Sequence, residues 1–158
     1  MDTLSLVTDN ITDLLVKILE FTRLRQKTLT RNIHNLGKRD FLPEDLPVQE
    51  FSNVVNRALA EHIQHRRLLL RDTQNIRFGE DGKMDIAPIT DELAKTLLQE
   101  NQDEYLELQI DKLLENSLNQ KLAAQLLKHK QATITTVSGP FIKRQDKEKN
   151  QLKDMPME

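Results

Sequence analysis

A leucine-rich segment near the C-terminus, residues 110–127, has the sequence IDKLLENSLNQKLAAQLL. Its large apolar side chains recur every three or four residues, which is the spacing of one face of an α-helix. The row from Ile110 to Leu126 advances by four residues at each step, so it drifts around a straight helix instead of holding a strict heptad. The segment predicts a long helix whose apolar side packs against other helices.

The predicted helix extends well beyond this segment. Thr90-Asp91-Glu92 is a helix start signal, and neither Pro nor Gly follows it until Gly139. Asn101-Gln102-Asp103 interrupts the pattern with poor helix formers, so a break is expected there. We predict a C-terminal helix over 90–137, followed by a disordered charged tail over 138–158, where Lys, Asp, Glu and Gln dominate.

A second amphipathic segment covers Asp9–Leu36 and predicts an N-terminal helix within residues 1–36. Residues 8–10 are all competent N-cap types, and Gly37 stands where a C′ glycine would end the helix. Its apolar residues follow one another at spacings of three and four, with an interruption at Arg25 and Gln26. The resulting stripe is narrow, which suits a helix–helix seam better than burial in a globular core.

The middle of the chain, residues 37–89, is expected to be irregular. Pro43 and Pro47 predict an extended, partly exposed connector, since a residue before proline avoids the helical region. A second helix is expected from Pro47 or Glu50 to about Arg71. The apolar residues of 76–78 and 84–86 alternate around Gly79-Glu80-Asp81-Gly82, a pattern that predicts a short hairpin.

The predicted fold class is therefore mainly α, with long N- and C-terminal helices that pair as a coiled-coil-like bundle. The 158 residues favour one domain. The chain is 37% hydrophobic but only 4% aromatic, and 30% of its residues are charged. So little large apolar surface favours amphipathic helices that complete their burial in partners.

Composition also limits the classes of function. The net charge of −2 argues against nucleic-acid binding by the whole chain. The absence of cysteine excludes disulfides, thiolate metal sites and cysteine nucleophiles. The acidic start, MDTLSL, does not predict a secretory signal, and no window of 18 apolar residues predicts a membrane span.

Patterns that would indicate catalysis or metal binding are weak. His62 and His65 lie three residues apart and could share a helix face as two zinc ligands, but nothing marks a third ligand. The carboxylates lack the apolar pocket that acid–base chemistry needs, and the serines lack an elbow or base motif. We expect no enzyme activity, no cofactor and no metal.

A basic segment, residues 57–71, keeps an alternative function open. Its cationic groups could neutralise phosphates, or they could pair with the acidic C-terminal helix. The second interpretation is favoured because no aromatic residue is interleaved for base stacking and the overall charge is negative. The alternative is a soluble helical adaptor or regulator that binds nucleic acid or a partner helix through the residues Arg57, His62, His65, Arg66, Arg67 and Arg71.

Two stretches together resemble the flagellar basal-body rod and hook proteins. Residues 25–35, RQKTLTRNIHN, are similar to the end of that family's N-terminal helix, and residues 45–51, DLPVQEF, follow at the distance seen in proximal-rod members. Residues 113–118, LLENSL, and 123–127, AAQLL, are similar to the family's closing helix. A second register for that helix, with Glu100-Asn101 and Tyr105, remains open.

The resemblance implies a structural subunit of the proximal rod, not an enzyme, located in the periplasmic part of the flagellar basal body. It implies type III export without a cleaved signal peptide, and no nucleic acid or small-molecule substrate. The implied partners are copies of the chain, other rod proteins, the adaptor between the MS ring and the rod, and the export apparatus.

In such an assembly the terminal helices would pair and then pack against neighbouring subunits. Arg25 is expected to pair with an acid on a neighbour. The other residues expected at the interface are the apolar Leu15, Ile18, Leu29 and Ile33, facing Leu118, Leu122 and Leu126, and the polar Asn32, Asn35 and Asn116.

Overall fold

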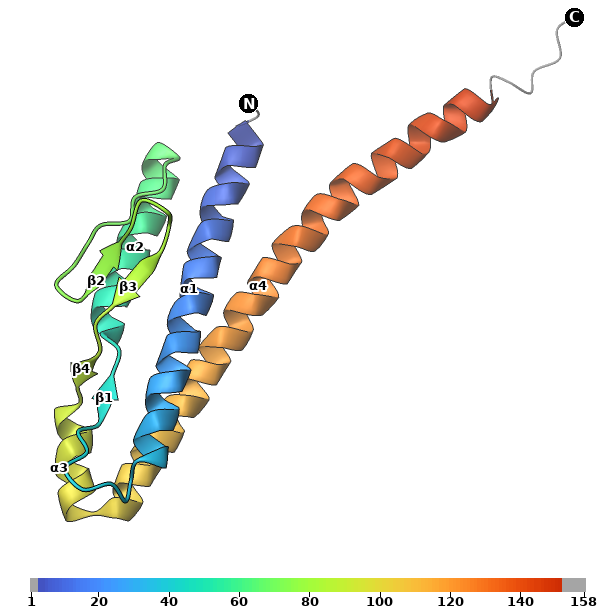
Figure 1. The fold of residues 1–158 in the computed structure, drawn as a ribbon. Helices are drawn as coiled ribbons and strands as arrows, with labels where there is room; N and C mark the ends of the chain where they lie inside the picture. Colours follow the sequence, from blue (N-terminus) through green and yellow to red (C-terminus); the bar gives the residue numbers. More distant parts are fainter. Residues whose placement is uncertain (1–2, 152–158) are drawn as a thin grey trace, which may run out of the picture.

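The computed structural model describes the backbone of residues 3–151 and the side-chain surroundings of residues 10–132. This part of the chain is mainly α-helical, as predicted, with two short strand pairs (Figure 1). In chain order the elements are α1 (Thr3–His34), β1 (Glu44–Asp45), α2 (Val48–His65), β2 (Ile76–Phe78), β3 (Met84–Ile86), β4 (Ile89–Thr90), α3 (Glu92–Glu100) and α4 (Gln102–Gln151).

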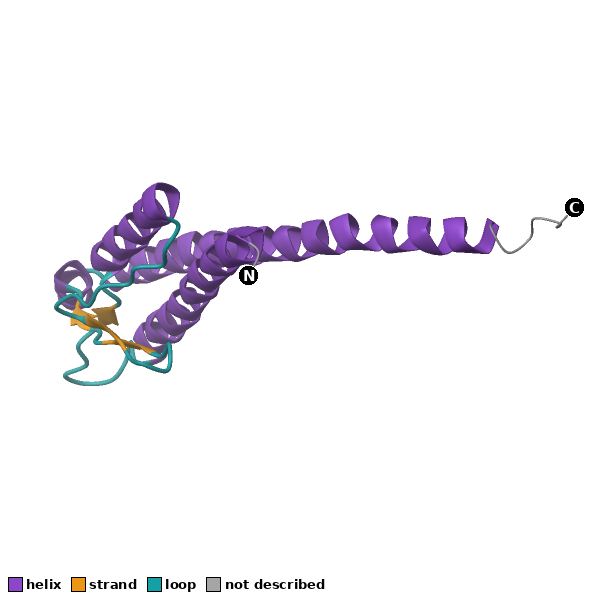
Figure 2. Cartoon of the chain, turned by 90° about the horizontal axis from the view of Figure 1, so that it is seen from above, coloured by secondary structure: helices purple, strands orange, loops and turns teal. Residues whose placement is uncertain are grey.

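The two terminal helices, α1 and α4, lie side by side and run in opposite directions (Figure 1). The short helix α3 folds back against the start of α4. Helix α2 and the β2–β3 hairpin pack against α1 through a shared apolar cluster. Seen from above, α4 extends well beyond the other elements (Figure 2). Towards its C-terminal end α4 leans away from α1.

Helix α1 differs from the predicted helix at both ends. It begins at Thr3, so the cap expected at residues 8–10 is wrong. It ends at His34, and Gly37 does not adopt the positive φ of a C′ glycine. Asn35 terminates it instead: its backbone N–H and its side-chain Nδ2 both donate to the Arg31 carbonyl, at 3.0 and 2.9 Å. These bonds satisfy a carbonyl that the helix end would otherwise leave unpaired.

The connector between α1 and α2 is extended and partly exposed, as predicted: Leu42 is 51% exposed, whereas the residues around β1 are buried. Pro43 is fully buried and Leu46 is 4% exposed. Strand β1 pairs antiparallel with β4, with Glu44 opposite Thr90. The sequence could not reveal this, because the two partners are two-residue strands more than forty residues apart.

Helix α2 begins directly after Pro47, as predicted, but ends at His65, well before Arg71. Arg66 takes a left-handed conformation, φ 57°, and its N–H bonds the His62 carbonyl at 3.0 Å. Residues 66–71 therefore do not continue the helix. The predicted hairpin is confirmed: β2 and β3 pair antiparallel, and Gly82 supplies the positive φ of 74° in the turn.

The break predicted at Asn101 is also confirmed, and there the chain reverses direction between α3 and α4. Asp91 caps α3 by accepting from the Ala94 N–H at 3.1 Å. The α4 backbone stays helical to Gln151, so the end predicted at Val137 and the disordered tail expected from residue 138 do not agree with it. Residues 152–158 of that tail lie outside the described part.

Two apolar clusters hold α1 in place. The larger consists of Phe21, Leu46, Phe51, Ile76 and Met84, and joins α1 to the connector, α2 and the hairpin. Within it the rings of Phe21 and Phe51 stack with centroids 4.0 Å apart. The smaller cluster joins Leu15 and Leu19 of α1 to Ala123 of α4, flanked by Ile11, Ile18 and Leu127.

Candidate assembly surface

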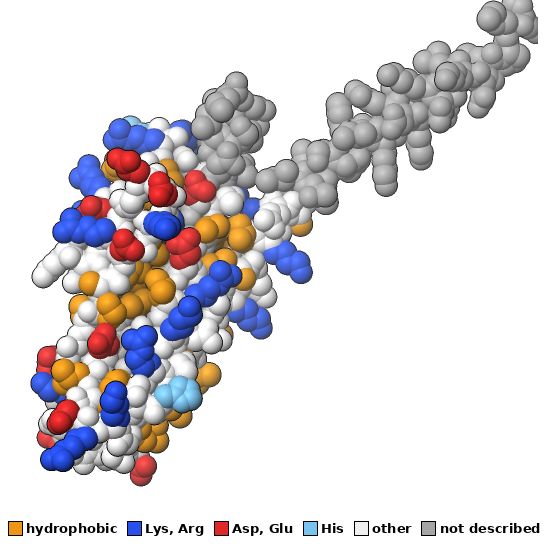
Figure 3. Space-filling view, in the orientation of Figure 1, with side chains coloured by type: hydrophobic (Ala, Val, Ile, Leu, Met, Phe, Trp, Pro, Cys, Tyr) orange, Lys and Arg blue, Asp and Glu red, His pale blue; other side chains and the backbone are white. Residues whose placement is uncertain are grey.

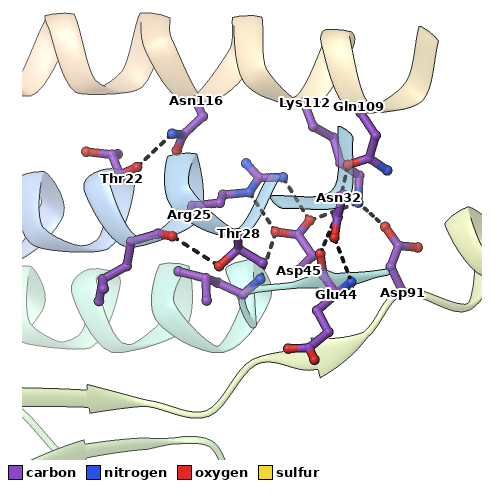
Figure 4. Close-up of polar contacts among 12 residues, drawn as sticks. Thr22, Arg25, Thr28, Asn32, Glu44, Asp45, Asp91, Gln109, Lys112 and Asn116 are labelled. Carbon is purple, nitrogen blue, oxygen red and sulfur yellow. Dashed lines mark hydrogen bonds and ion pairs between the residues drawn. The ribbon is translucent and has the colours of Figure 1, made fainter. Parts of the chain in front are cut away.

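The contact between α1 and α4 is apolar at one end and polar at the other. Towards the α1 N-terminus, the smaller apolar cluster fills it. Towards the α3–α4 turn most buried side chains are polar, although Leu29 is also fully buried there: Thr22, Arg25 and Asn32 from α1, with Gln109 and Asn116 from α4. Asn116 Nδ2 donates to the Thr22 carbonyl at 2.8 Å, a bond across the two helices (Figure 4). Buried polar groups need such partners, so they fix how the helices align.

Asn32 is the centre of one polar group. Its amide exchanges two bonds with the Glu44 backbone, donating to the carbonyl at 2.7 Å and accepting from the N–H at 3.1 Å. It also donates to Gln109 Oε1 at 2.9 Å. Tyr105 OH donates to the Asn32 carbonyl at 2.8 Å. One residue therefore ties α1 to β1 and to two turns of α4.

Gln109 is fully buried, yet its Nε2 has no hydrogen-bond partner among the described residues. Its Oε1 is used by Asn32, whose own orientation is fixed by the Glu44 backbone. The orphaned amide hydrogens therefore carry a desolvation cost of about 1–3 kcal/mol.

Four charged side chains form a second group, which we call the charge clasp. Pairing of β1 with β4 brings Asp45 close to Asp91, whose N–H bonds the Pro43 carbonyl at 3.0 Å. Arg25 donates to both Asp45 oxygens, at 3.0 and 3.1 Å. Lys112 Nζ bridges the two carboxylates, 2.8 Å from Asp45 and 2.6 Å from Asp91 (Figure 4). The clasp joins α1, β1, α4 and the cap of α3 with balanced charge.

The surroundings of the clasp favour its ionised form. Burial raises the pKa of Asp45, but hydrogen bonds and charges from Arg25 and Lys112 outweigh burial and hold that pKa below its ordinary value. Burial lowers the pKa of Lys112, and its bonds to Asp45 and Asp91 more than reverse this, so its pKa lies above the ordinary value. Burial, helped by the Asp91 charge, raises the pKa of Tyr105 to about 12.

Several residues predicted for contacts with a neighbour are buried in the subunit instead. Arg25 pairs with Asp45 of its own chain, so its assignment to an acid on a neighbour is wrong. Asn35 bonds its own helix. Ile18 and Ile33 are half-buried. Four others are buried within the subunit: Leu15, Leu29, Asn32 and Asn116.

The opposite holds for the leucine row of α4. Leu118, Leu122 and Leu126, together with Ile110 and Leu114, are 48–69% exposed. Within the subunit Leu15 packs on Ala123, and Leu122 and Leu126 line a groove that Leu15 and Ile18 also line. The facing of the α1 stripe with Leu118, Leu122 and Leu126 across two subunits stays a prediction. We call these five side chains of α4 the outer leucine row.

The outer leucine row reaches two hollows on the surface. Each step of four residues turns by about 40° around an α-helix, so the row winds from one side of α4 to the other. Leu122 and Leu126 line a groove of about 410 Å³ between α1, α2 and α4, whose apolar floor includes Ile18, Phe51 and Val55. Ile110 and Leu114 line a smaller hollow of about 290 Å³ beside Gln26 of α1.

The sequence did not point to most residues of the polar groups. Asp45, Asp91 and Lys112 meet only because β1 pairs with β4. Tyr105 and Gln109 lie four residues apart, at helical spacing, in a segment rich in charged residues, and this indicates that both could face inward. Nothing in the sequence indicated their partners. The outer leucine row was visible in the sequence.

The structure does not favour the alternative sites. His62 is 4% exposed and lies 3.4 Å from Asn10 Nδ2, whereas His65 is exposed and contacts Glu61, so the two do not form a shared ligand face. Arg67 also pairs with Glu61, at 2.9 Å, and the basic segment changes direction at Arg66. Within the described residues, no three His, Asp or Glu side chains are grouped as metal ligands would be.

Comparison with known protein families, with curated proteins and with solved structures found no match. Among the described residues, none of the helices carries an apolar stretch of the length needed to cross a lipid bilayer.

Proposed function

We propose that this chain is a structural subunit of a bacterial flagellar basal-body rod, of the proximal-rod type, without a catalytic role. The observation that carries the proposal is the outer leucine row, five large apolar side chains that lie about half exposed or more on one helix. Soluble proteins rarely leave a continuous apolar surface of this kind uncovered unless it binds something. A helix–helix assembly contact would bury the row.

The residues that carry the resemblance to rod proteins support this function because they contact one another. Arg25 and Asn32 lie in the segment 25–35, and Asp45 lies in the segment 45–51. Arg25 pairs with Asp45, and the Asn32 side chain donates a hydrogen bond to Gln109. The Asn32 carbonyl accepts a hydrogen bond from the Tyr105 hydroxyl. The contact of Tyr105 favours the register of the closing helix that includes Glu100-Asn101 and Tyr105.

The pairing of the terminal helices supports it as well. On α4 the buried positions Tyr105, Gln109, Asn116 and Ala123 are separated by four or seven residues. On α1 one row of buried positions has separations of three or four residues: Leu15, Leu19, Thr22, Arg25, Leu29 and Asn32. This spacing is that of a coiled-coil seam, so we infer a short antiparallel coiled-coil-like pair. Inside a rod the pair would form the rigid body of the subunit, with copies of itself, other rod proteins and the MS-ring adaptor as neighbours. Export by the flagellar type III apparatus would place it in the periplasm.

A localisation experiment tests the function. The gene is deleted in the encoding bacterium and restored with an epitope-labelled copy, and purified basal bodies are examined by electron microscopy and mass spectrometry. A rod subunit should be present in rod-bearing basal bodies, and the deletion strain should be non-motile with basal bodies that lack a rod. Complete rods and normal swimming in the deletion strain would contradict the proposal.

A further inference from the structure

The α1–α4 pair has two different apolar surfaces on its two sides. The groove takes Leu122, Leu126 and Asn119 from α4, whereas the hollow takes Ile110, Leu113 and Ser117. At about 100° per residue, these two sets lie on opposite sides of Asn116, which faces α1. A contact made by the groove therefore leaves the hollow side of the same subunit free.

The two surfaces also differ in charge. Glu115 lines the groove, and Asp111 is exposed one turn earlier on the same side of α4. On the other side, Lys121 follows Ser117 by four residues and Lys128 follows by eleven, and both are exposed. Arg23 of α1 is exposed three residues before Gln26, which lines the hollow. Arg25 also lines the groove but is paired with Asp45, and the acid Glu107 lies on the hollow side three residues before Ile110. Around Ser117 the hollow side is nevertheless basic and the groove wall at Glu115 is acidic, so the two are complementary there.

We propose that the groove is the docking site for the hollow side of a second copy of this chain, whose Ile110 and Leu114 enter it. This proposal rests on the proposed function, since it names the partner of the same surface. Figure 3 shows apolar side chains along the lower right edge of the molecule and Lys and Arg side chains further up the same edge. Exposed apolar side chains with basic neighbours complement an apolar groove with an acidic wall in polarity and charge.

The contact is head-to-tail and does not close on itself as a two-fold dimer. A two-fold contact would bring a surface against its own copy, so acidic Asp111 and Glu115 would approach the same acids, and the lysines the same lysines. A groove-to-hollow contact avoids both and leaves one free groove and one free hollow at the two ends of any oligomer. The structure therefore predicts open-ended growth instead of a closed pair.

The absence of cysteine allows a direct test by cross-linking. Ser52 lines the groove and Ser117 lines the hollow, both are exposed, and serine to cysteine is a nearly isosteric change. Purified Ser52→Cys and Ser117→Cys chains are treated with a short bis-maleimide, separately, mixed, and as one chain that carries both changes. A covalent dimer should form in the mixture but not in either variant alone. The chain with both cysteines should give a ladder of dimers, trimers and larger products.

A second substitution shows whether the ladder reports the docked contact. Leu114→Asp, added to the double-cysteine chain, should reduce the ladder at least tenfold, whereas Leu93→Asp should leave it unchanged, since Leu93 is 59% exposed on α3 away from both surfaces. Circular dichroism checks that both variants are folded. A dimer from one cysteine variant alone would show a two-fold contact and overturn the proposal. The absence of any cross-linked product would also overturn it, as would a ladder that Leu114→Asp leaves unchanged.

The outcomes also separate this proposal from the proposed function. A chain that is found in rods but gives no ladder would be a rod subunit that docks only on other rod proteins, which overturns the inference alone. A chain that gives the ladder but is absent from basal bodies would overturn the rod function and leave the self-docking surface standing.

Discussion

Tyr105 is the only tyrosine of the chain, so its ionisation can be followed without interference. It is fully buried, its hydroxyl donates to the Asn32 carbonyl, and its pKa is raised to about 12. The raised pKa means that Tyr105 contributes stability below the unfolded value near 10, and that this contribution is lost as pH rises from about 10 to 12.

The prediction is a delayed titration of Tyr105. The absorbance change of tyrosinate at 295 nm should have its midpoint well above 10 in the native chain and near 10 in guanidinium chloride. Tyr105→Phe should keep the helical circular dichroism but unfold more easily, by about 1 kcal/mol, because one buried hydrogen bond is lost. A native midpoint equal to that of the denatured chain would contradict the buried, bonded position of this hydroxyl.

Asp45 is the acid that both bases of the charge clasp contact. Asp45→Asn would leave Arg25 and Lys112 without that charge in a largely buried place, so we expect a loss of about 3 kcal/mol in the free energy of unfolding. The matched control is Arg77→Gln, because Arg77 pairs with Asp72 at 3.7 Å in an exposed place and should cost under about 1 kcal/mol. Urea unfolding measures both. Equal losses for the two variants would show that the clasp is worth no more than a surface ion pair.

The clasp also sets a pH range for stability. The pKa of Asp45 is lowered in the folded chain, so its contribution is present above the unfolded value near 4 and is lost as pH falls through the lower folded value. The pKa of Lys112 is raised, so its contribution is present below about 10.4 and is lost as pH rises beyond it. In Asp45→Asn, the free energy of unfolding, measured by urea unfolding at a series of pH values, should therefore fall less steeply below about pH 4 than in the unchanged chain.

At the scale of elements, α4 has an inner and an outer side with different tasks. Leu15, 7% exposed, packs on the inner side, whereas Leu118 is 69% exposed on the outer side. Leu15→Ala should lower the free energy of unfolding of the dilute chain by about 2–4 kcal/mol, the cost of a cavity in a packed seam. Leu118→Ala should change it by under about 0.5 kcal/mol. Thermal unfolding of dilute samples compares them, and a similar loss for both would mean that Leu118 is covered in the subunit.

The sequence predicted the elements better than the contacts between them. Helix α2, the hairpin and the break at Asn101 followed from local signals, namely Pro47, the glycines at 79 and 82, and the residues after Glu100. The end of α2 was missed because Arg66 takes a left-handed conformation that is unusual for arginine and that no propensity marks. Element boundaries depend on such single residues.

The candidate site was predictable only where it lies on a single element. The outer leucine row follows from helical periodicity alone. Its exposure within the subunit does not, because the sequence could not show which side of α4 faces α1. The charge clasp could not be predicted, because its acids meet through a strand pair between residues far apart in the chain. Arg25 looked like an interruption of a stripe for the same reason: its partner, Asp45, lies outside the helix.

At the scale of the whole molecule, the buried seam of the α1–α4 pair serves folding, and the exposed outer leucine row serves the proposed assembly. We therefore predict that Leu118→Asp leaves the monomer folded but abolishes its incorporation into the proposed rod, because a carboxylate would have to be buried without a partner. Folding is checked by circular dichroism and by the Tyr105 titration, and incorporation by swimming and by the amount of labelled chain in purified basal bodies. Leu93→Asp makes the same chemical change on α3, away from the outer leucine row, and should be incorporated as well as the unchanged chain. Normal incorporation of Leu118→Asp would remove the outer leucine row from the assembly surface, whereas loss with both variants would assign the defect to an added charge anywhere on the molecule.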